Sequence, residues 1–198
     1  MNNPISKALE PLGRLIAVVS GYVLLGLAFA MSVEIVGRKL FAFSFQGIDD
    51  IGGYVLAIIA VAGAGCGVIA KTHVRIDIFL VRLPKGLQRF LNMLAMIAMA
   101  GFACFSTWRG ARVLEESVEF GSRAVNPLQT PLWIPQAIWL LGLGFFSAVS
   151  CAYAVHAVKL FFSGSNALND FYGPVSVNKD LEEELQALEE RREEGMEL

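Results

Sequence analysis

The stretch KTHVRIDIF, residues 71–79, gathers the side chains in this sequence that are best suited to chemistry. His73 and Asp77 are four residues apart, so a helix would place them on one face. Such a pair could hold a metal ion, relay a proton, or anchor a segment at a membrane surface. Two ligands without a nearby cysteine or further histidine make a poor metal site. The charged surroundings of His73 also disfavour a haem shared with His156. A simple local contact between His73 and Asp77 is the plainest interpretation.

The composition excludes an ordinary soluble domain. Hydrophobic residues make up 55% of the 198 residues and charged residues only 17%, and the mean hydropathy is +0.56. Long uncharged runs in such a chain are typical of helices that span a bilayer. The sequence contains no basic cluster with interleaved aromatic residues and no GxSxG, HExxH, P-loop or Rossmann motif. We therefore expect neither a nucleic-acid partner nor an enzyme, and we predict no catalytic residue, metal or cofactor.

Four apolar runs predict an all-α membrane protein with four transmembrane helices. The runs cover approximately residues 15–36, 51–70, 90–108 and 133–158. As a helix with a rise of about 1.5 Å per residue, each can cross roughly 30 Å of hydrocarbon. The cysteines fall in separate runs, where we interpret them as small packing residues: Cys66, Cys104 and Cys151. We expect a transmembrane domain over residues 1–162. An acidic cytoplasmic tail with a helix near its end would follow over residues 163–198.

Basic residues beside the runs predict the orientation. With both termini in the cytoplasm, eleven Lys and Arg residues lie inside and five lie outside, as the positive-inside rule requires. Residues 71–89 alone supply five of the inner charges. One alternative for the start of the chain is a signal peptide cleaved after Ala28-Phe29-Ala30. The apolar run continues past that position, which favours an uncleaved first helix.

The segment after the second run has a helical period of its own. Ile76, Phe79, Leu80 and Leu83 recur at i, i+3, i+4 and i+7, and Pro84 follows them. With Arg75 and Arg82 nearby, this pattern predicts a short amphipathic helix on the inner membrane surface, between spans two and three. KTHVRIDIF is then an anchor rather than a reactive centre.

The second run carries a stripe of small residues with a heptad period. Small side chains allow helices to approach closely in lipid, where packing replaces the missing hydrophobic drive. This stripe, the seam of residues 51–70, predicts a close helix–helix contact, either within the chain or with another chain. Its members are Gly53, Ala57, Ala60, Ala64 and Gly67.

The distribution of charge suggests what kind of membrane protein this is. A transport pathway normally shows ionisable residues within the membrane or paired helix breaks. Here no Asp, Glu, Lys, Arg or His lies in the middle of a run. The pattern favours a supporting subunit. The alternative is a self-sufficient small channel or carrier, which would need a polar path.

An ordered set of short motifs over residues 12–160 resembles the DctQ-like small membrane subunit of tripartite ATP-independent periplasmic (TRAP) transporters. Arg38 follows the first span, Asp50 opens the second in IDDIGGY, and Gly63 lies thirteen residues later. THVRID then supplies His73, Arg75 and Asp77, followed by RLP at residues 82–84 and PLWIP at residues 131–135. Asp50 departs from the family pattern, which usually has Glu there.

This resemblance implies a non-catalytic scaffold subunit of a sodium-coupled transporter in the bacterial inner membrane, importing an organic acid. It implies a large membrane subunit that carries the substrate, and a periplasmic substrate-binding protein that delivers it. Membrane lipids are further expected partners. Six residues are candidates for contacts with lipid headgroups or the partner subunit: Arg38, Asp50, Lys71, His73, Arg75 and Asp77.

Overall fold

Long helices make up nearly all of the structure. The computed structural model describes residues 4–41, 47–70, 80, 82–126, 128–163 and 167–172. Within these ranges four helices are long and apolar enough to cross a membrane, and each predicted span lies inside one of them. The helices are α1 (Pro4–Phe41), α2 (Ile48–Ala70), α4 (Lys85–Glu119), α5 (Trp133–Phe162) and the short α6 (Ala167–Tyr172).

Two of the helices are much longer than the spans predicted within them. The helix α1 has 38 residues and α4 has 35, which correspond to lengths of about 57 Å and 52 Å. The apolar core of a bilayer is only roughly 30 Å thick. Both helices therefore continue beyond it, and the turns that project carry most of their charged residues.

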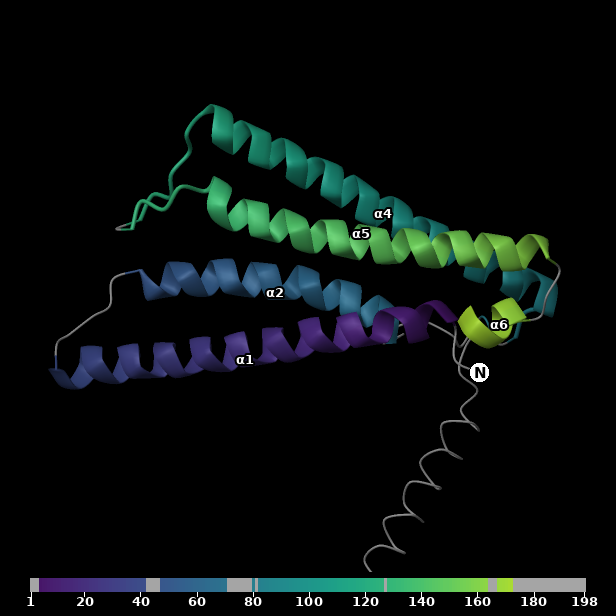
Figure 1. Ribbon diagram of the computed structural model, residues 1–198, viewed down its shortest axis with the longest axis horizontal. Coiled ribbons are helices and arrows are strands. Elements are labelled where there is room, and N and C mark those ends of the chain that lie inside the picture. Colours follow the sequence, from purple (N-terminus) through teal and green to yellow (C-terminus); the bar gives the residue numbers. More distant parts are fainter. Residues whose placement is uncertain are drawn as a thin grey trace, which may run out of the picture.

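The helices form a row rather than a tightly closed bundle (Figure 1). The main contacts run from α4 to α5, from α5 to α2 and from α2 to α1. In the most apolar stretch of α1, 0% of the residues are buried, whereas 33% of the residues in the corresponding stretch of α5 are buried. Thus α5 is an inner helix of the row and α1 is its most exposed member.

Glycines bring α2 and α5 together, and this contact joins the α1–α2 hairpin to the α4–α5 hairpin. A Cβ atom on Gly65 of α2 would lie 2.6 Å from the ring of Phe145 and 3.5 Å from the Cα atom of Phe146. A Cβ atom on Gly142 of α5 would lie 3.7 Å from the backbone nitrogen of Ala62. The two backbones can approach this closely because neither glycine has a side chain.

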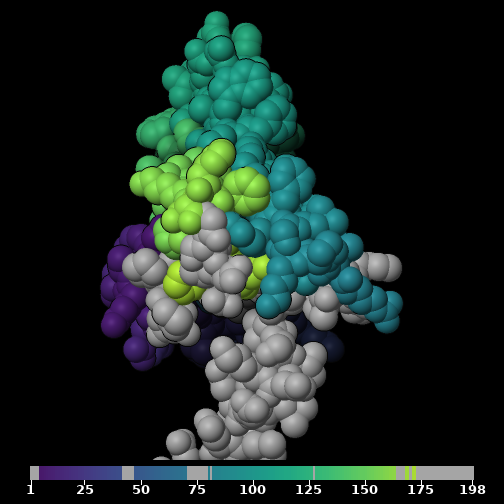
Figure 2. Space-filling view, turned by 90° about the vertical axis from the view of Figure 1, so that its right-hand side faces the viewer, coloured from purple at the N-terminus to yellow at the C-terminus, as the bar shows by residue number. Residues whose placement is uncertain are grey.

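The short helix α6 covers one end of the row, which we call the α6 end. The opposite end, where α1 meets α2 and α4 meets α5, is the loop end. Figure 2 looks onto the α6 end and shows yellow-green atoms from the end of α5 and from α6 between the purple start of α1 and the blue start of α4. Leu168 is 0% and Tyr172 3% exposed, so α6 closes the core there.

The predicted interfacial helix and acidic tail fall mainly on residues 71–79, 81 and 173–198, outside the described part of the chain. Both therefore stay predictions. Between the described ends of α4 and α5, the loop contains an isolated antiparallel bridge between Arg123 and Pro131.

Exchanging Gly65 for Leu tests the contact between α2 and α5. Because the new side chain has no room beside Phe145, we expect the free energy of unfolding in micelles to fall by about 1–3 kcal/mol. Gly63 is the matched control, because nothing lies within 4 Å of a Cβ atom built there. In the isolated chain Gly63→Leu should leave stability unchanged. Equal losses in the two variants would contradict this packing.

Candidate functional site

Charged side chains at the loop end form a small cluster between α1 and α2. Arg38 Nη2 donates a hydrogen bond of 3.0 Å to Oε1 of Glu34, one helical turn earlier. The same nitrogen lies 3.8 Å from Oδ2 of Asp49 at the start of α2. Glu34 is only 2% exposed, although it lies on the most exposed helix. A buried carboxylate is destabilising unless it has a partner of opposite charge, so the ion pair with Arg38 is important for the stability of the fold.

This cluster gives Arg38 an intramolecular role that the sequence only partly indicated. The favourable spacing of Glu34 and Arg38 was visible in the sequence, whereas the burial of Glu34 was not. On α2, the acid that pairs with Arg38 is Asp49, whose side chain is 78% exposed. The predicted contact residue Asp50 is partly buried one position further into α2. Contacts of Arg38 and Asp50 with a lipid or a partner remain proposals.

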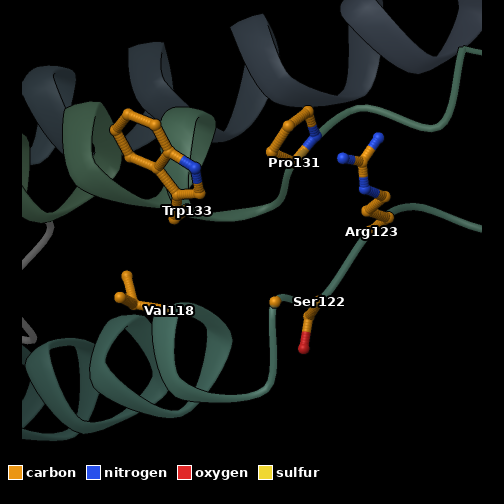
Figure 3. Close-up of a pocket in the computed structure, with 6 residues that line it drawn as sticks. Val118, Ser122, Arg123, Pro131 and Trp133 are labelled. Atoms are coloured by element: carbon orange, nitrogen blue, oxygen red, sulfur yellow. The ribbon is translucent and has the colours of Figure 1, made fainter.

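An open cavity of about 450 Å³ lies at the loop end, between the end of α4 and the start of α5. In Figure 3, Trp133 and Pro131 lie on one side, Val118 lies across from Trp133, and Arg123 comes from the connecting loop. The lining is mainly apolar, and among the described residues that form it Arg123 alone is charged. Specific sites for small polar molecules usually have several convergent polar groups, so this cavity does not resemble a substrate site.

The seam of residues 51–70 lies on α2 and turns away from the other helices over its first half. Gly53, Ala57 and Ala60 are exposed, and the space around a Cβ atom on Gly53 is empty. Ala64 and Gly67 are partly buried, and Ala64 packs against the core. The contacts of α2 inside the chain use Gly52, which faces α1, and Gly65, which faces α5. The structure therefore leaves the first half of the seam open to lipid or to another chain.

Polar side chains tie the α6 end together. The hydroxyl groups of Ser6 and Tyr153 are 2.7 Å apart, and Nδ1 of His156 lies 2.7 Å from the hydroxyl of Tyr172. The rings of Tyr153 and Tyr172 meet edge to face at 6.1 Å. These contacts connect α1, α5 and α6. His156, which the sequence placed near a helix end, thus has a structural partner.

A second set of polar contacts connects α6 to α4. The amide of Asn92 donates to Oδ1 of Asn169 at 3.3 Å, and the amide of Asn169 donates to the carbonyl of Lys85 at 3.2 Å. Arg89 donates to the carbonyl of Phe161 at 3.2 Å and stacks over the ring of that residue. Asn92 is 2% exposed, and an asparagine at this depth in an apolar run was a signal that the sequence interpretation passed over.

The remaining predicted contact residues lie outside the described part of the chain: Lys71, His73, Arg75 and Asp77. Among the residues that are described, there is no group of three or more His, Cys, Asp or Glu side chains that could hold a metal ion. The polar contacts given above lie near the two ends of the row. These contacts can hold the helices together and fix the position of the surfaces that the helices expose.

The helices define the class first: this is a multi-pass membrane protein, and four helices in its described part are able to span a bilayer. The family follows from comparison with family models. Residues 27–161 match the model described as "Tripartite ATP-independent periplasmic transporters, DctQ component". The match covers more than half of the chain, so the protein belongs to the DctQ family, the small membrane component of TRAP transporters. A comparison with curated proteins gives no match. The resemblance drawn from the sequence motifs is thus confirmed.

Exchange of Arg38 tests the cluster at the loop end. We expect Arg38→Gln to lower the free energy of unfolding by about 1–3 kcal/mol, because the buried Glu34 carboxylate loses a charged hydrogen-bond donor. Adding Glu34→Gln should recover most of that loss, since the remaining group is neutral. The measurement is a double-mutant cycle in micelles.

Arg112 supplies the control for this cycle, because its ion pair with Glu115 is exposed on both sides. Arg112→Gln should cost at most about 1 kcal/mol. If the effects of Glu34→Gln and Arg38→Gln simply add, then Arg38 acts through other partners and the cluster is not the source of its effect.

Proposed function

We propose that this chain is a non-catalytic scaffold subunit of a sodium-coupled TRAP transporter that imports an organic acid. Membership of the DctQ family supports a place in such a transporter. The observation that carries the scaffold role is the position of the charges. No Asp, Glu, Lys, Arg or His occurs between Arg14 and Glu34, between Asp50 and Ala70, between Arg89 and Arg109, or between Trp133 and His156.

Helices without ionisable side chains in these ranges lack the groups that sodium or a carboxylate substrate would need inside the membrane. In the proposal those groups belong to a large membrane subunit, and a periplasmic substrate-binding protein delivers the substrate. The small subunit enlarges the static part of the complex, against which the transporting part moves. A row of helices suits this task because it offers broad lateral surfaces to a neighbour.

We further propose that the α6 end faces the cytoplasm of a bacterium and the loop end faces the periplasm. The excess of Lys and Arg on the α6 side, including residues 71–89, supports this orientation. Trp108 and Trp133 would then lie at the periplasmic interface, where tryptophan is favoured.

The proposed docking surface for the large subunit is the exposed part of the seam on α2. Gly53, Ala57 and Ala60 are exposed and small, so another helix could approach the α2 backbone there as closely as α5 does at Gly65. Such contacts are driven by close packing, which large side chains prevent.

The first test is co-expression of the chain with a large TRAP membrane subunit from the same genome. The two proteins should purify together in detergent, and deletion of the small chain should abolish uptake. Failure to purify together, with uptake preserved after deletion, would reject the proposal. Solute flux through liposomes that contain the small chain alone would instead support a self-sufficient carrier.

Enlarging the seam tests the docking surface. Ala57→Leu combined with Ala60→Leu should reduce recovery of the complex about tenfold or more, because a clash of a few kcal/mol opposes association. The isolated variant should keep its thermal stability, since both positions are exposed. Ala98 is an exposed residue on α4. The variant Ala98→Leu is the matched control and should assemble normally. Normal assembly of the seam variant would place the interface elsewhere.

The basic stretch after α2 gives a separate prediction. In the proposal Lys71, His73, Arg75 and Asp77 contact lipid headgroups or the partner subunit at the cytoplasmic face. Replacing Arg75 or Asp77 by Ala should lower the yield of complex and leave the KM for substrate unchanged in the complexes that form. A normal yield with an altered KM would contradict this assignment.

A further inference from the structure

Two cysteines from neighbouring helices meet at the junction of α4 and α5. The sulfur atoms of Cys104 on α4 and Cys151 on α5 are 3.4 Å apart. Ser147, one helical turn before Cys151, places its hydroxyl 3.3 Å from the sulfur of Cys104. All three cysteines of the protein carry free thiols. Neither the scaffold role nor the contacts at the two ends uses this group.

We propose that Cys104 and Cys151 form a dithiol site, open to the membrane, that binds lipophilic compounds of trivalent arsenic. An arsenic(III) centre bonded to two sulfur atoms is pyramidal and holds them close together. It therefore selects thiols that are already neighbours. Here the thiols touch in the folded chain, and the packing of α4 against α5 fixes the distance between them. Binding needs no rearrangement of the helices.

The reaction with an arsenoxide is a condensation without oxidation or reduction. Two As–S bonds form, two S–H bonds break, and the two protons leave with the arsenoxide oxygen as one water molecule. Reactants and products are neutral. This matters because a hydrocarbon environment disfavours the thiolate that most thiol reagents require.

The position of the site allows such a compound to reach it. Cys104 is exposed, as are its neighbours Phe105 and Trp108. Cys104 precedes Trp108 by four residues, or about 6 Å along the helix. Cys104 thus lies slightly deeper in the membrane than Trp108, which we place at the membrane interface. A neutral aromatic arsenoxide dissolves at this depth.

The third cysteine provides an internal comparison. Cys66 is partly buried, and its thiol donates to the carbonyl of Gly13 at 3.4 Å. It has no part in the thiol pair. A single thiol forms only one As–S bond, and an excess of a competing monothiol removes such an adduct. A bridged adduct requires a competing dithiol for its removal.

The test uses the full chain in lipid nanodiscs, phenylarsine oxide as the probe, and intact mass measurement. We expect one adduct per chain, heavier than the protein by the reagent less one water. It should survive excess monothiol and disappear with 2,3-dimercaptopropanol. Cys104→Ser and Cys151→Ser should each lose it, and Cys66→Ser should retain it.

A folded wild-type chain that forms no such adduct would overturn the proposal. So would an adduct that persists in Cys151→Ser. Size-exclusion profiles establish folding, and Cys151→Ala serves as the second variant if the serine form does not fold. The readout is made on the chain alone and therefore does not depend on the proposed scaffold role.

Discussion

The rest of the fold depends on the close approach of α2 and α5. Gly65 and Gly142 leave each helix free to lie against the backbone or rings of the other. In lipid this matters more than in water, because apolar side chains gain little by leaving one apolar environment for another. The contact is the main packing between the two hairpins, and it sets the order α4, α5, α2, α1.

Polar contacts complete the row at its two ends. At the α6 end, amide and imidazole groups connect α6 with α4 and α5, and a pair of hydroxyl groups connects α1 with α5. At the loop end, Arg38 lies between a buried acid and an exposed one. Polar groups at these positions can reach interfacial water or each other, whereas a charge at mid-membrane would cost about 2.5–3.5 kcal/mol on insertion scales. The middle of the row is therefore held by packing, which suits the static role that we propose for the chain.

Much of this arrangement could be predicted from the sequence, because the bilayer imposes a simple rule on apolar length. The four long apolar helices and the family both followed from the order of the runs and motifs, and the structure and the family match confirm them. The ends of the helices could not be placed, since α1 and α4 continue through charged turns that no apolar criterion detects. The helix α6, only six residues long, also gave no signal.

The seam shows most clearly where sequence reasoning stops. Small residues occur on several faces of α2, and neighbouring residues on a helix point about 100° apart. The pattern alone could not show that Gly52 and Gly65 face the chain's own helices while Gly53 and Gly63 face outward. The burial of Glu34 could not be predicted for the same reason, because it depends on which side of α1 meets α2. The spans can be predicted from the sequence, whereas the helix faces that meet are known only from the folded structure.

The central claim is that the exposed face of α2 meets the transporting subunit. Photo-crosslinking tests it most directly, with p-benzoylphenylalanine introduced at Ala57 of the small chain in membranes that contain the whole transporter. We expect a covalent product with the large subunit from Ala57 and none from Ala98, which is also exposed but lies on α4. A product from Ala98 with none from Ala57 would contradict it.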